Sequence, residues 1–245
     1  MMIKTDSKPS IKLLHGLIEE NKIAEFENLP ELWVFGYGSL VWLPNFTFTE
    51  KVTGYVSGYD RRFYQSNVTH RGTTSLPGRV ATLLPSTNEN ARTYGVAFRL
   101  VGQSEIAAAL LHLNMRESTL GGYILKADLV STKNGQIPAV FYVATAENDQ
   151  YTGVESLEKL ASIIAVAKGP SGPNTDYLFN LATWQHKNCP EVIDDHLYGL
   201  EKLTKMAIFD RKTSKPSLMA KRAYLGMVWY NFVPDHSIRP RRTRG

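Results

Sequence analysis

The sequence predicts a single α+β domain built on a compact antiparallel β-barrel, or a strongly curled sheet, flanked by helices. Three observations carry this prediction. Short segments rich in β-branched and aromatic residues follow one another closely between residues 32 and 145. Helical patterns interrupt them in few places and dominate from residue 154 onward. A hydrophobic fraction of 43% in 245 residues is enough for one sizeable core.

The strand candidates have Gly, Pro, Asn or Thr near their ends, which is typical of turns. The first, residues 32–36, is a short apolar run that leads into a Gly-Tyr-Gly-Ser cluster. The others span residues 51–59, 61–66, 79–84, 94–100, 123–131 and 139–145. Their close spacing favours the largely antiparallel barrel.

Four main helical segments accompany these strands. Ser104 is placed to cap a helix over residues 105–118, because its hydroxyl can accept an unpaired N–H of the first turn. Further helices are predicted over residues 154–168, 176–186 and 191–209, the first of these ended by Gly169 and the second capped by Asn174. The Gly-Pro-Ser-Gly-Pro sequence at 169–173 separates two of them as a rigid corner.

The chain divides into three predicted parts: a polar arm with a short amphipathic helix (1–30), the domain (31–210) and a basic extension (211–245). The extension holds nine cations and one acid, so it accounts for the net charge of +5. A solvated tail is the expected interpretation, and contact with nucleic acid or anionic lipid is the alternative.

Cysteine content and hydropathy indicate a cytoplasmic protein. The single cysteine, Cys189, permits no intramolecular disulfide, which fits a reducing compartment and equally a cysteine-poor secreted protein. The N-terminus has no apolar run of signal-peptide length, and no stretch of eighteen apolar residues occurs. We therefore expect the protein to stay where it is made, without a membrane partner.

The predicted helix over residues 105–118 places a carboxylate at the end of an apolar stripe. Ile106, Leu110 and Leu113 define its buried face, and four residues further the stripe reaches Glu117. Burial raises the pKa of a carboxyl group, which suits a general acid/base near neutral pH. Two other interpretations remain open: Glu117 faces water beyond a frayed helix end, or it pairs structurally with Arg116 or Arg71.

A glycine-rich turn follows the first strand at Gly36-Tyr37-Gly38-Ser39-Leu40. Two glycines allow a tight turn whose backbone N–H groups face one point, where a carboxylate or a developing oxyanion can bind. A purely architectural turn is the competing interpretation. The turn is not a phosphate loop, because no Gly-Lys-Ser/Thr follows.

A loop at residues 70–80 carries two arginines, Arg71 and Arg79, whose forked donors suit a substrate carboxylate. A glycine-rich surface loop with one structural arginine is the alternative. Tyr123 and Tyr177 follow glycine-containing turns and are candidates to close a pocket, although each alone is more often a core residue. No histidine or cysteine lies at metal-ligand spacing from His70, so no metal site is predicted.

Four separated blocks occur in the order of the signatures of a known enzyme family. They are FGYGSLVW at 35–42, RGT at 71–73 with PGRV at 77–80, NMRE at 114–117 with GGY at 121–123, and GPSGPN at 169–174 with YL at 177–178. Together they resemble the ChaC-type γ-glutamylcyclotransferases. The match extends from about residue 32 to residue 203.

The resemblance implies a γ-glutamylcyclotransferase-like barrel and a lyase that breaks glutathione into 5-oxoproline and Cys-Gly, with neither metal nor organic cofactor. It implies Glu117 as the catalytic acid/base and the Tyr37–Leu40 backbone as the holder of the γ-glutamyl end. The expected substrate-binding residues are Phe35, Gly36, Tyr37, Gly38, Ser39, Leu40, Arg71, Tyr123 and Tyr177. No nucleic-acid partner is expected, and the protein is expected to be a monomer or weak oligomer.

Two alternatives stay open at this point. The enzyme could act on other γ-glutamyl peptides or on γ-glutamylamines, because no readable signature marks a Cys-Gly pocket. The domain could instead bind γ-glutamyl or peptide ligands without turnover. Loss of Glu117 would have been the sign of such a module, and Glu117 is present.

Overall fold

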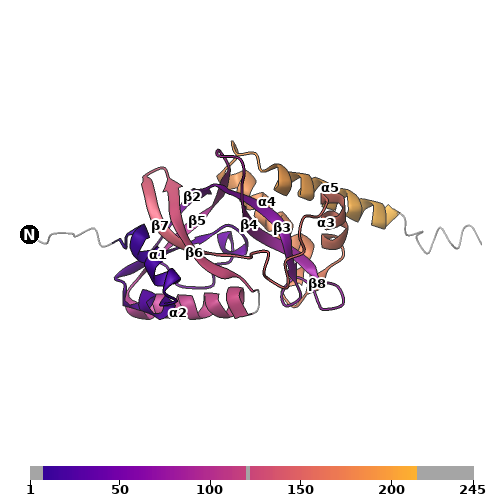
Figure 1. Ribbon diagram of the computed structural model, residues 1–245. Helices are drawn as coiled ribbons and strands as arrows, with labels where there is room; N and C mark the ends of the chain where they lie inside the picture. The colour runs from indigo at the N-terminus through magenta and orange to yellow at the C-terminus, as the bar shows by residue number, and fades with distance from the viewer. Residues whose placement is uncertain (1–7, 120–121, 214–245) are drawn as a thin grey trace, which may run out of the picture. The chain divides into compact units, whose positions relative to one another are not determined.

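The computed structural model describes residues 8–119 and 122–213 (Figure 1). Residues 1–207 form one compact unit, which contains the site analysed below, and residues 208–245 form a second. The basic residues beyond position 213, including the arginines of the predicted tail, lie outside the described residues.

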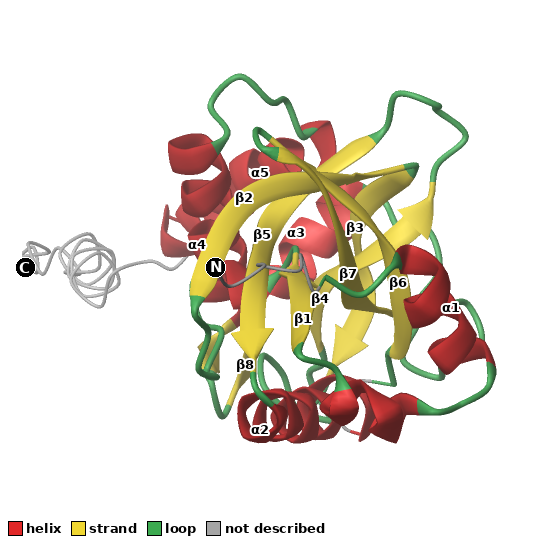
Figure 2. Cartoon of the chain, turned by 90° about the vertical axis from the view of Figure 1, so that its left-hand side faces the viewer, coloured by secondary structure: helices red, strands yellow, loops and turns green. Residues whose placement is uncertain are grey.

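Five strands close into a barrel in the order β1-β5-β2-β6-β7 (Figure 2). They are β1 (Glu31–Gly36), β2 (Glu50–Ser57), β5 (Arg92–Val101), β6 (Ile124–Thr132) and β7 (Gly135–Val143). All neighbours pair antiparallel except β1 and β7, which close the barrel in parallel through Val34 and Val140. The predicted barrel with flanking helices is confirmed, with this one parallel pairing.

Two strands form a separate hairpin beside the barrel. β3 (Tyr59–Asn67) and β4 (Gly78–Pro85) pair with each other, with an irregular register between Arg62 and Gln65. Thr82 joins β4 to the end of β7: its hydroxyl donates to the Ala144 carbonyl (3.1 Å) and accepts from the Ala144 N–H (2.9 Å). The hairpin is therefore held against the barrel.

The helices and short elements follow the chain order. They are α1 (Ile11–Glu19), η1 (Ile23–Asn28), η2 (Ser39–Val41), α2 (Gln103–Leu113), the π-helical turn η3 (Asn114–Thr119), α3 (Leu157–Ile164), α4 (Asn174–Asn188) and α5 (Asp195–Thr213). A two-residue hairpin of β8 (Lys168–Gly169) and β9 (Gly172–Pro173) joins α3 to α4. Helix α1 lies beside β6, where the imidazole of His15 hydrogen-bonds the Ala127 carbonyl (2.9 Å) (Figure 2).

Two predicted helix caps are wrong, each for a local reason. Helix α2 begins at Gln103 with Gly102 at the N-cap, since Gly102 has a φ of 96° that favours glycine, and the Ser104 hydroxyl donates to Glu105 instead. Asn174 is the first residue of α4, and its side chain bonds the backbone of Arg79. The Ser104 side chain is thus used by its neighbour in sequence, and the Asn174 side chain by a tertiary contact.

Helix α3 is shorter than predicted, and its start has a clear cause. Ser156 caps it, its hydroxyl oxygen accepting from the N–H of Lys159 (3.3 Å). The predicted corner after it is confirmed in part: residues 168–173 are not helical, but they pair as β8 and β9.

The core fills the barrel and extends under the helices. Its largest fully buried side chains include Phe26, Phe35, Phe98 and Phe141, and Phe35 packs edge-on against Phe141 with ring centroids 6.2 Å apart. Leu14 of α1 is also fully buried. No helix of the described residues is both long and apolar enough to cross a bilayer.

Candidate active site

A cavity of about 650 Å³ opens between the end of β1, the β3–β4 hairpin, η3 and α4. Its size lies within the roughly 300–1,000 Å³ of small-molecule sites. Leu43, Leu111 and Met115, which are exposed, lie on one side of it. All ten residues predicted for the site line this cavity: Phe35, Gly36, Tyr37, Gly38, Ser39, Leu40, Arg71, Glu117, Tyr123 and Tyr177.

Glu117 reaches the cavity from a π-helical turn. The predicted α-helix over residues 105–118 ends at Leu113, and η3 continues it with the wider π spacing. Such turns are rare and occur frequently at functional sites. The Glu117 carbonyl accepts from the N–H of Tyr123 (2.9 Å), which ties the turn to the start of β6. The carboxylate is 18% exposed and lines the cavity, so the frayed-end interpretation is wrong.

Burial raises the pKa of Glu117, and the charge of Arg116 lowers it in part. Arg116 Nε lies 3.1 Å from Glu117 Oε1, and its other guanidinium nitrogen bonds the Ser39 hydroxyl. Arg116 thus connects the carboxylate to the glycine turn. The net direction is upward, so Glu117 holds its proton at a higher pH than an ordinary carboxyl group.

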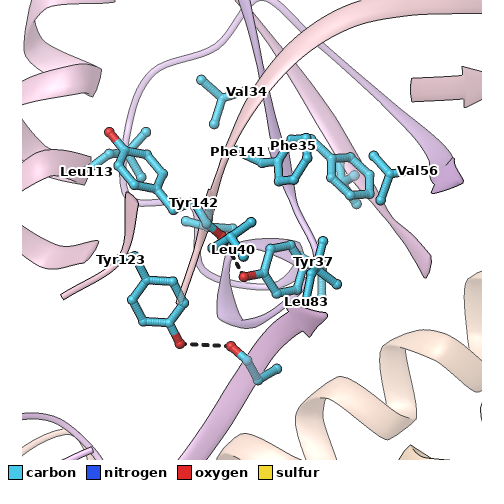
Figure 3. Close-up of a cluster of buried hydrophobic side chains, with 14 of the residues drawn as sticks. Val34, Phe35, Tyr37, Leu40, Val56, Leu83, Leu113, Tyr123, Phe141 and Tyr142 are labelled. Carbon is cyan, nitrogen blue, oxygen red and sulfur yellow. Dashed lines mark hydrogen bonds between the residues drawn. The ribbon is translucent and has the colours of Figure 1, made fainter. Parts of the chain in front are cut away.

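Four tyrosines surround Glu117. Burial raises the pKa of each phenol, and the charge of Glu117 raises it further. Their hydroxyls are engaged elsewhere. Tyr37 donates to the Tyr142 carbonyl (2.6 Å) and Tyr123 to the Ala81 carbonyl (2.8 Å) (Figure 3). Tyr142 donates to Asn114 Oδ1 (2.6 Å). These three phenols therefore donate no hydrogen bond to the carboxylate, so they do not offset the effect of burial on its pKa.

Tyr177 differs from the other three tyrosines. Its hydroxyl accepts from the Ala81 N–H (3.2 Å), and none of the described residues accepts its proton. The ring is held edge-on by Trp42 and Phe63. A Cβ on Gly38 would come within 2.7 Å of the Tyr177 hydroxyl, so only glycine fits there. Tyr177 thus presents an unused donor beside the glycine turn.

The glycine turn exposes backbone donors. Within the described residues, the N–H groups of Gly38, Ser39 and Leu40 have no protein acceptor, while the following N–H groups bond back into the turn. A Cβ on Gly36 would lie 2.4 Å from that of Leu40, which explains the second glycine. The turn can therefore accept an anionic group, as its sequence predicts.

The loop after β3 brings Arg71 into the cavity and leaves Arg79 outside it. Asn67 Oδ1 accepts from the N–H groups of His70 (3.0 Å) and Arg71 (2.6 Å), which fixes the backbone there. Arg79 instead pairs with Glu155, Nε to Oε2 at 2.8 Å, and both side chains are buried. Of the two arginines predicted to offer donors, only Arg71 lines the cavity.

Sequence reasoning did not single out Tyr142, Asn67 or His112, which also line the cavity. Tyr142 lies in a run of buried residues on β7, where nothing in the sequence separates a cavity residue from a core residue. Arg116 was considered only as a structural partner of Glu117, and it makes that ion pair. In the part of the chain that the structure describes, no three His, Cys, Asp or Glu side chains converge as metal ligands.

Comparison with known proteins identifies the family. A family model described as ChaC-like protein matches residues 32–207. The zebrafish (Danio rerio) protein named glutathione-specific γ-glutamylcyclotransferase 1 is 44% identical over 173 residues, 69% of this chain and 87% of the relative. The human protein of that name is 41% identical over 172 residues, 69% and 76% of the two chains. This chain belongs to the ChaC-like family.

A solved structure agrees with this assignment. The crystal structure described as a γ-glutamyl cyclotransferase specific to glutathione from yeast superposes with a TM-score of 0.67 and 26% identity. The alignment covers 73% of this chain and 97% of the yeast chain. The barrel and its flanking helices are thus the fold of that enzyme.

Proposed function

We propose that this protein is a glutathione-specific γ-glutamylcyclotransferase that releases 5-oxoproline and Cys-Gly. The observation that carries the proposal is a carboxyl group with a raised pKa, Glu117, inside a cavity that also holds the unpaired N–H groups of the glycine turn. The names of the family relatives support glutathione as substrate.

The substrate's own α-amine is the nucleophile. It attacks the γ-carbonyl carbon, a C–N bond forms to close the five-membered lactam, and the C–N bond to cysteine breaks, so that no water is consumed. Because the attack is intramolecular, a well-folded substrate avoids much of the entropic barrier, on the order of 7–11 kcal/mol. The enzyme must hold the peptide folded back and move protons from the attacking nitrogen to the departing one.

Glu117 carries out this proton transfer. Its carboxylate accepts one proton from the α-ammonium, which frees the amine to attack, and then donates that proton to the departing nitrogen of Cys-Gly. The attacking nitrogen gives up its second proton to the regenerated carboxylate as it becomes the lactam N–H, and that proton passes to solvent or to the released amine. A carboxyl group with a raised pKa suits both tasks, since it is a stronger base than an ordinary carboxylate and can return the proton that it accepts. Arg116 orients the carboxylate, because its guanidinium contacts both Glu117 and the Ser39 hydroxyl.

The glycine turn and Tyr177 bind the charged and polar groups at the reacting end. The N–H groups of Gly38 to Leu40 hold the α-carboxylate or the oxyanion of the tetrahedral intermediate. The Tyr177 hydroxyl, whose proton has no acceptor among the described residues, adds a donor there. Phe35, Tyr37 and Tyr123 shape the wall around the γ-glutamyl group.

We also propose the domain boundaries, the cellular location and the assembly state of the protein. The catalytic domain spans residues 31–210, with 1–30 and 211–245 as extensions. The protein acts in the cytoplasm, which its single cysteine fits, as a monomer or weak oligomer without nucleic-acid or membrane partners.

The test is release of 5-oxoproline from glutathione by the purified chain, compared with γ-glutamyl-alanine and γ-glutamyl-lysine. Turnover of glutathione with little of the other two is expected. Faster turnover of either analogue would favour a cyclotransferase for other γ-glutamyl compounds. Binding of glutathione without release of 5-oxoproline would indicate a ligand-binding module instead of an enzyme.

A further inference from the structure

The three most buried arginines of the described residues differ in how their charge is balanced. Arg61, Arg71 and Arg79 are 2%, 9% and 8% exposed. Arg61 lies 3.5 Å from Asp194 and also contacts Gln185 and the Tyr94 carbonyl. Arg79 pairs with Glu155. Arg71 makes one hydrogen bond, to the Pro173 carbonyl (3.2 Å).

Arg71 has no carboxylate within the 4.0 Å ion-pair distance in residues 8–119 and 122–213. Asp176 acts on it only through space, and burial lowers the pKa of the Arg71 guanidinium. A buried charge without a partner is costly, and most of the five N–H donors of Arg71 remain unused. Such a group is explained if its partner is a ligand.

The surroundings hold Arg71 in place. Asn67 fixes its backbone, and the β8–β9 hairpin presses against the loop: the Ser171 N–H donates to the His70 carbonyl (2.9 Å). A Cβ on Gly169 would come within 2.3 Å of that carbonyl oxygen, so the contact requires glycine. The donors of Arg71 are therefore preorganised on the cavity wall rather than mobile.

The charges of the cavity then match those of a γ-glutamyl dipeptide conjugate. Arg116 is engaged with Glu117 and Ser39, which leaves Arg71 as the uncompensated cation on the cavity wall of the described residues. Glutathione has an α-ammonium, an α-carboxylate and a glycine carboxylate. Under the proposed function Glu117 and the glycine turn take the first two, so the glycine carboxylate still needs a partner.

We infer that Arg71 binds the terminal carboxylate of the leaving dipeptide and thereby selects peptides over γ-glutamylamines. This inference rests on the proposed function. Exposed Ser171, beside the loop, marks this wall as reaching solvent, as the leaving end of the substrate requires. A γ-glutamylamine lacks that carboxylate and would leave the Arg71 charge unpaired. The enzyme would therefore bind the transition state of its reaction less tightly.

The test compares kcat/KM for glutathione, for glutathione with its glycine carboxylate converted to an amide, and for the analogue with 2-aminobutyrate in place of cysteine. The wild type is expected to prefer glutathione over the amide about tenfold to a hundredfold. Arg71→Gln should lower the rate with glutathione and the aminobutyrate analogue by that factor and leave the amide within about threefold. Arg71→Lys should restore part of the preference.

Several outcomes would overturn the inference. Equal losses with glutathione and its amide in Arg71→Gln would place Arg71 at the γ-glutamyl end or in a structural role. Equal turnover of the two substrates by the wild type would also contradict it, and that comparison needs no variant. Arg92→Gln, which removes an exposed arginine on β5, is the matched control and should change neither substrate. Turnover of neither substrate by the wild type would contradict the proposed function itself.

Discussion

Among the regions that bury a glutamate beside an arginine, two affect the charge of the glutamate in opposite ways. In the cavity, Glu117 has one ionic partner, Arg116, and burial raises its pKa. Behind the cavity wall lies a second group, the brace, formed by Arg79, Glu155 and Lys159. Burial alone would raise the pKa of Glu155, but hydrogen bonds from Arg79, Lys159 and Thr152 lower it to about 2.

The difference shows that hydrogen-bond partners, rather than solvent contact alone, set the chemistry of a buried carboxyl group. The Glu155 side chain is only 5% exposed and Glu117 is 18% exposed, yet Glu155 is the stronger acid. The Glu155 carboxylate accepts hydrogen bonds from partners that take the place of water, whereas the phenols beside Glu117 donate to other acceptors. The brace is therefore structural, and the cavity glutamate is available for proton transfer.

Glu117→Gln tests the cavity half of this comparison and has the largest expected effect. Glutamine keeps the shape but cannot accept and return a proton, so we expect kcat for 5-oxoproline release to fall by roughly a thousandfold or more. The melting temperature should stay near that of the wild type, because a neutral side chain suits this burial.

The matched control is Glu158→Gln, which removes an exposed carboxylate on α3 and should leave the rate unchanged. If Glu117→Gln kept more than about a tenth of the wild-type rate, the assignment of Glu117 as acid/base would be lost.

Glu155→Gln tests the brace. Removing the carboxylate leaves Arg79 buried with a neutral partner, and after allowing for solvent around the exposed Lys159 we expect a loss of about 2 kcal/mol in the free energy of unfolding. The folded variant should keep its kcat. Chemical denaturation followed by circular dichroism measures the first, and 5-oxoproline release measures the second.

The pH dependence of that loss has a definite sign. The folded-state pKa of Glu155, about 2, is below the reference value of 4.5, so its stabilisation is present above pH 4.5 and is lost as the pH falls toward 2. The difference between wild type and Glu155→Gln should therefore shrink over that window. A constant difference would mean that the glutamine acts through packing and not through charge.

The comparison also explains what the sequence could predict. The apolar stripe of α2 pointed to Glu117 correctly, because a helical period survives a change from α to π spacing over one turn. The sequence could not separate Arg71 from Arg79, since the deciding partner, Glu155, lies 76 residues beyond Arg79.

Local signals failed where tertiary contacts took the side chain. Asparagine is a favoured residue at helix N-caps, but the Asn174 side chain bonds the backbone of Arg79, which lies 95 residues away in the sequence. Tyr142 carried no local sign of its place in the cavity wall. Fold class and the catalytic candidate were thus predictable from periodicity and motif, and the assignment of charges to brace or cavity required the packed structure.

Arg116 in the cavity corresponds to Arg79 in the brace, because each arginine pairs with a buried glutamate. Its charge lowers the pKa of Glu117, against the larger effect of burial. The other ionisable groups around Glu117 are Tyr37, Tyr123, Tyr142 and Tyr177, whose raised pKa values keep them neutral. Removing the cation should therefore raise the pKa of Glu117 further.

The smallest predicted effect follows from this change. In the proposed mechanism the carboxylate form accepts the proton of the α-amine, so kcat/KM should rise as the pH increases through the Glu117 pKa. Arg116→Gln should move this acid limb to higher pH. The expected loss on that limb is about a few fold, as for one partly exposed ion pair, and Arg116→Lys should keep the limb near its wild-type position. Arg116 also bonds Ser39, so a loss of equal size at every pH would show that it acts by orienting the turn. A shift to lower pH would contradict the electrostatic account, because no neutral glutamine at position 116 can stabilise the carboxylate better than the arginine.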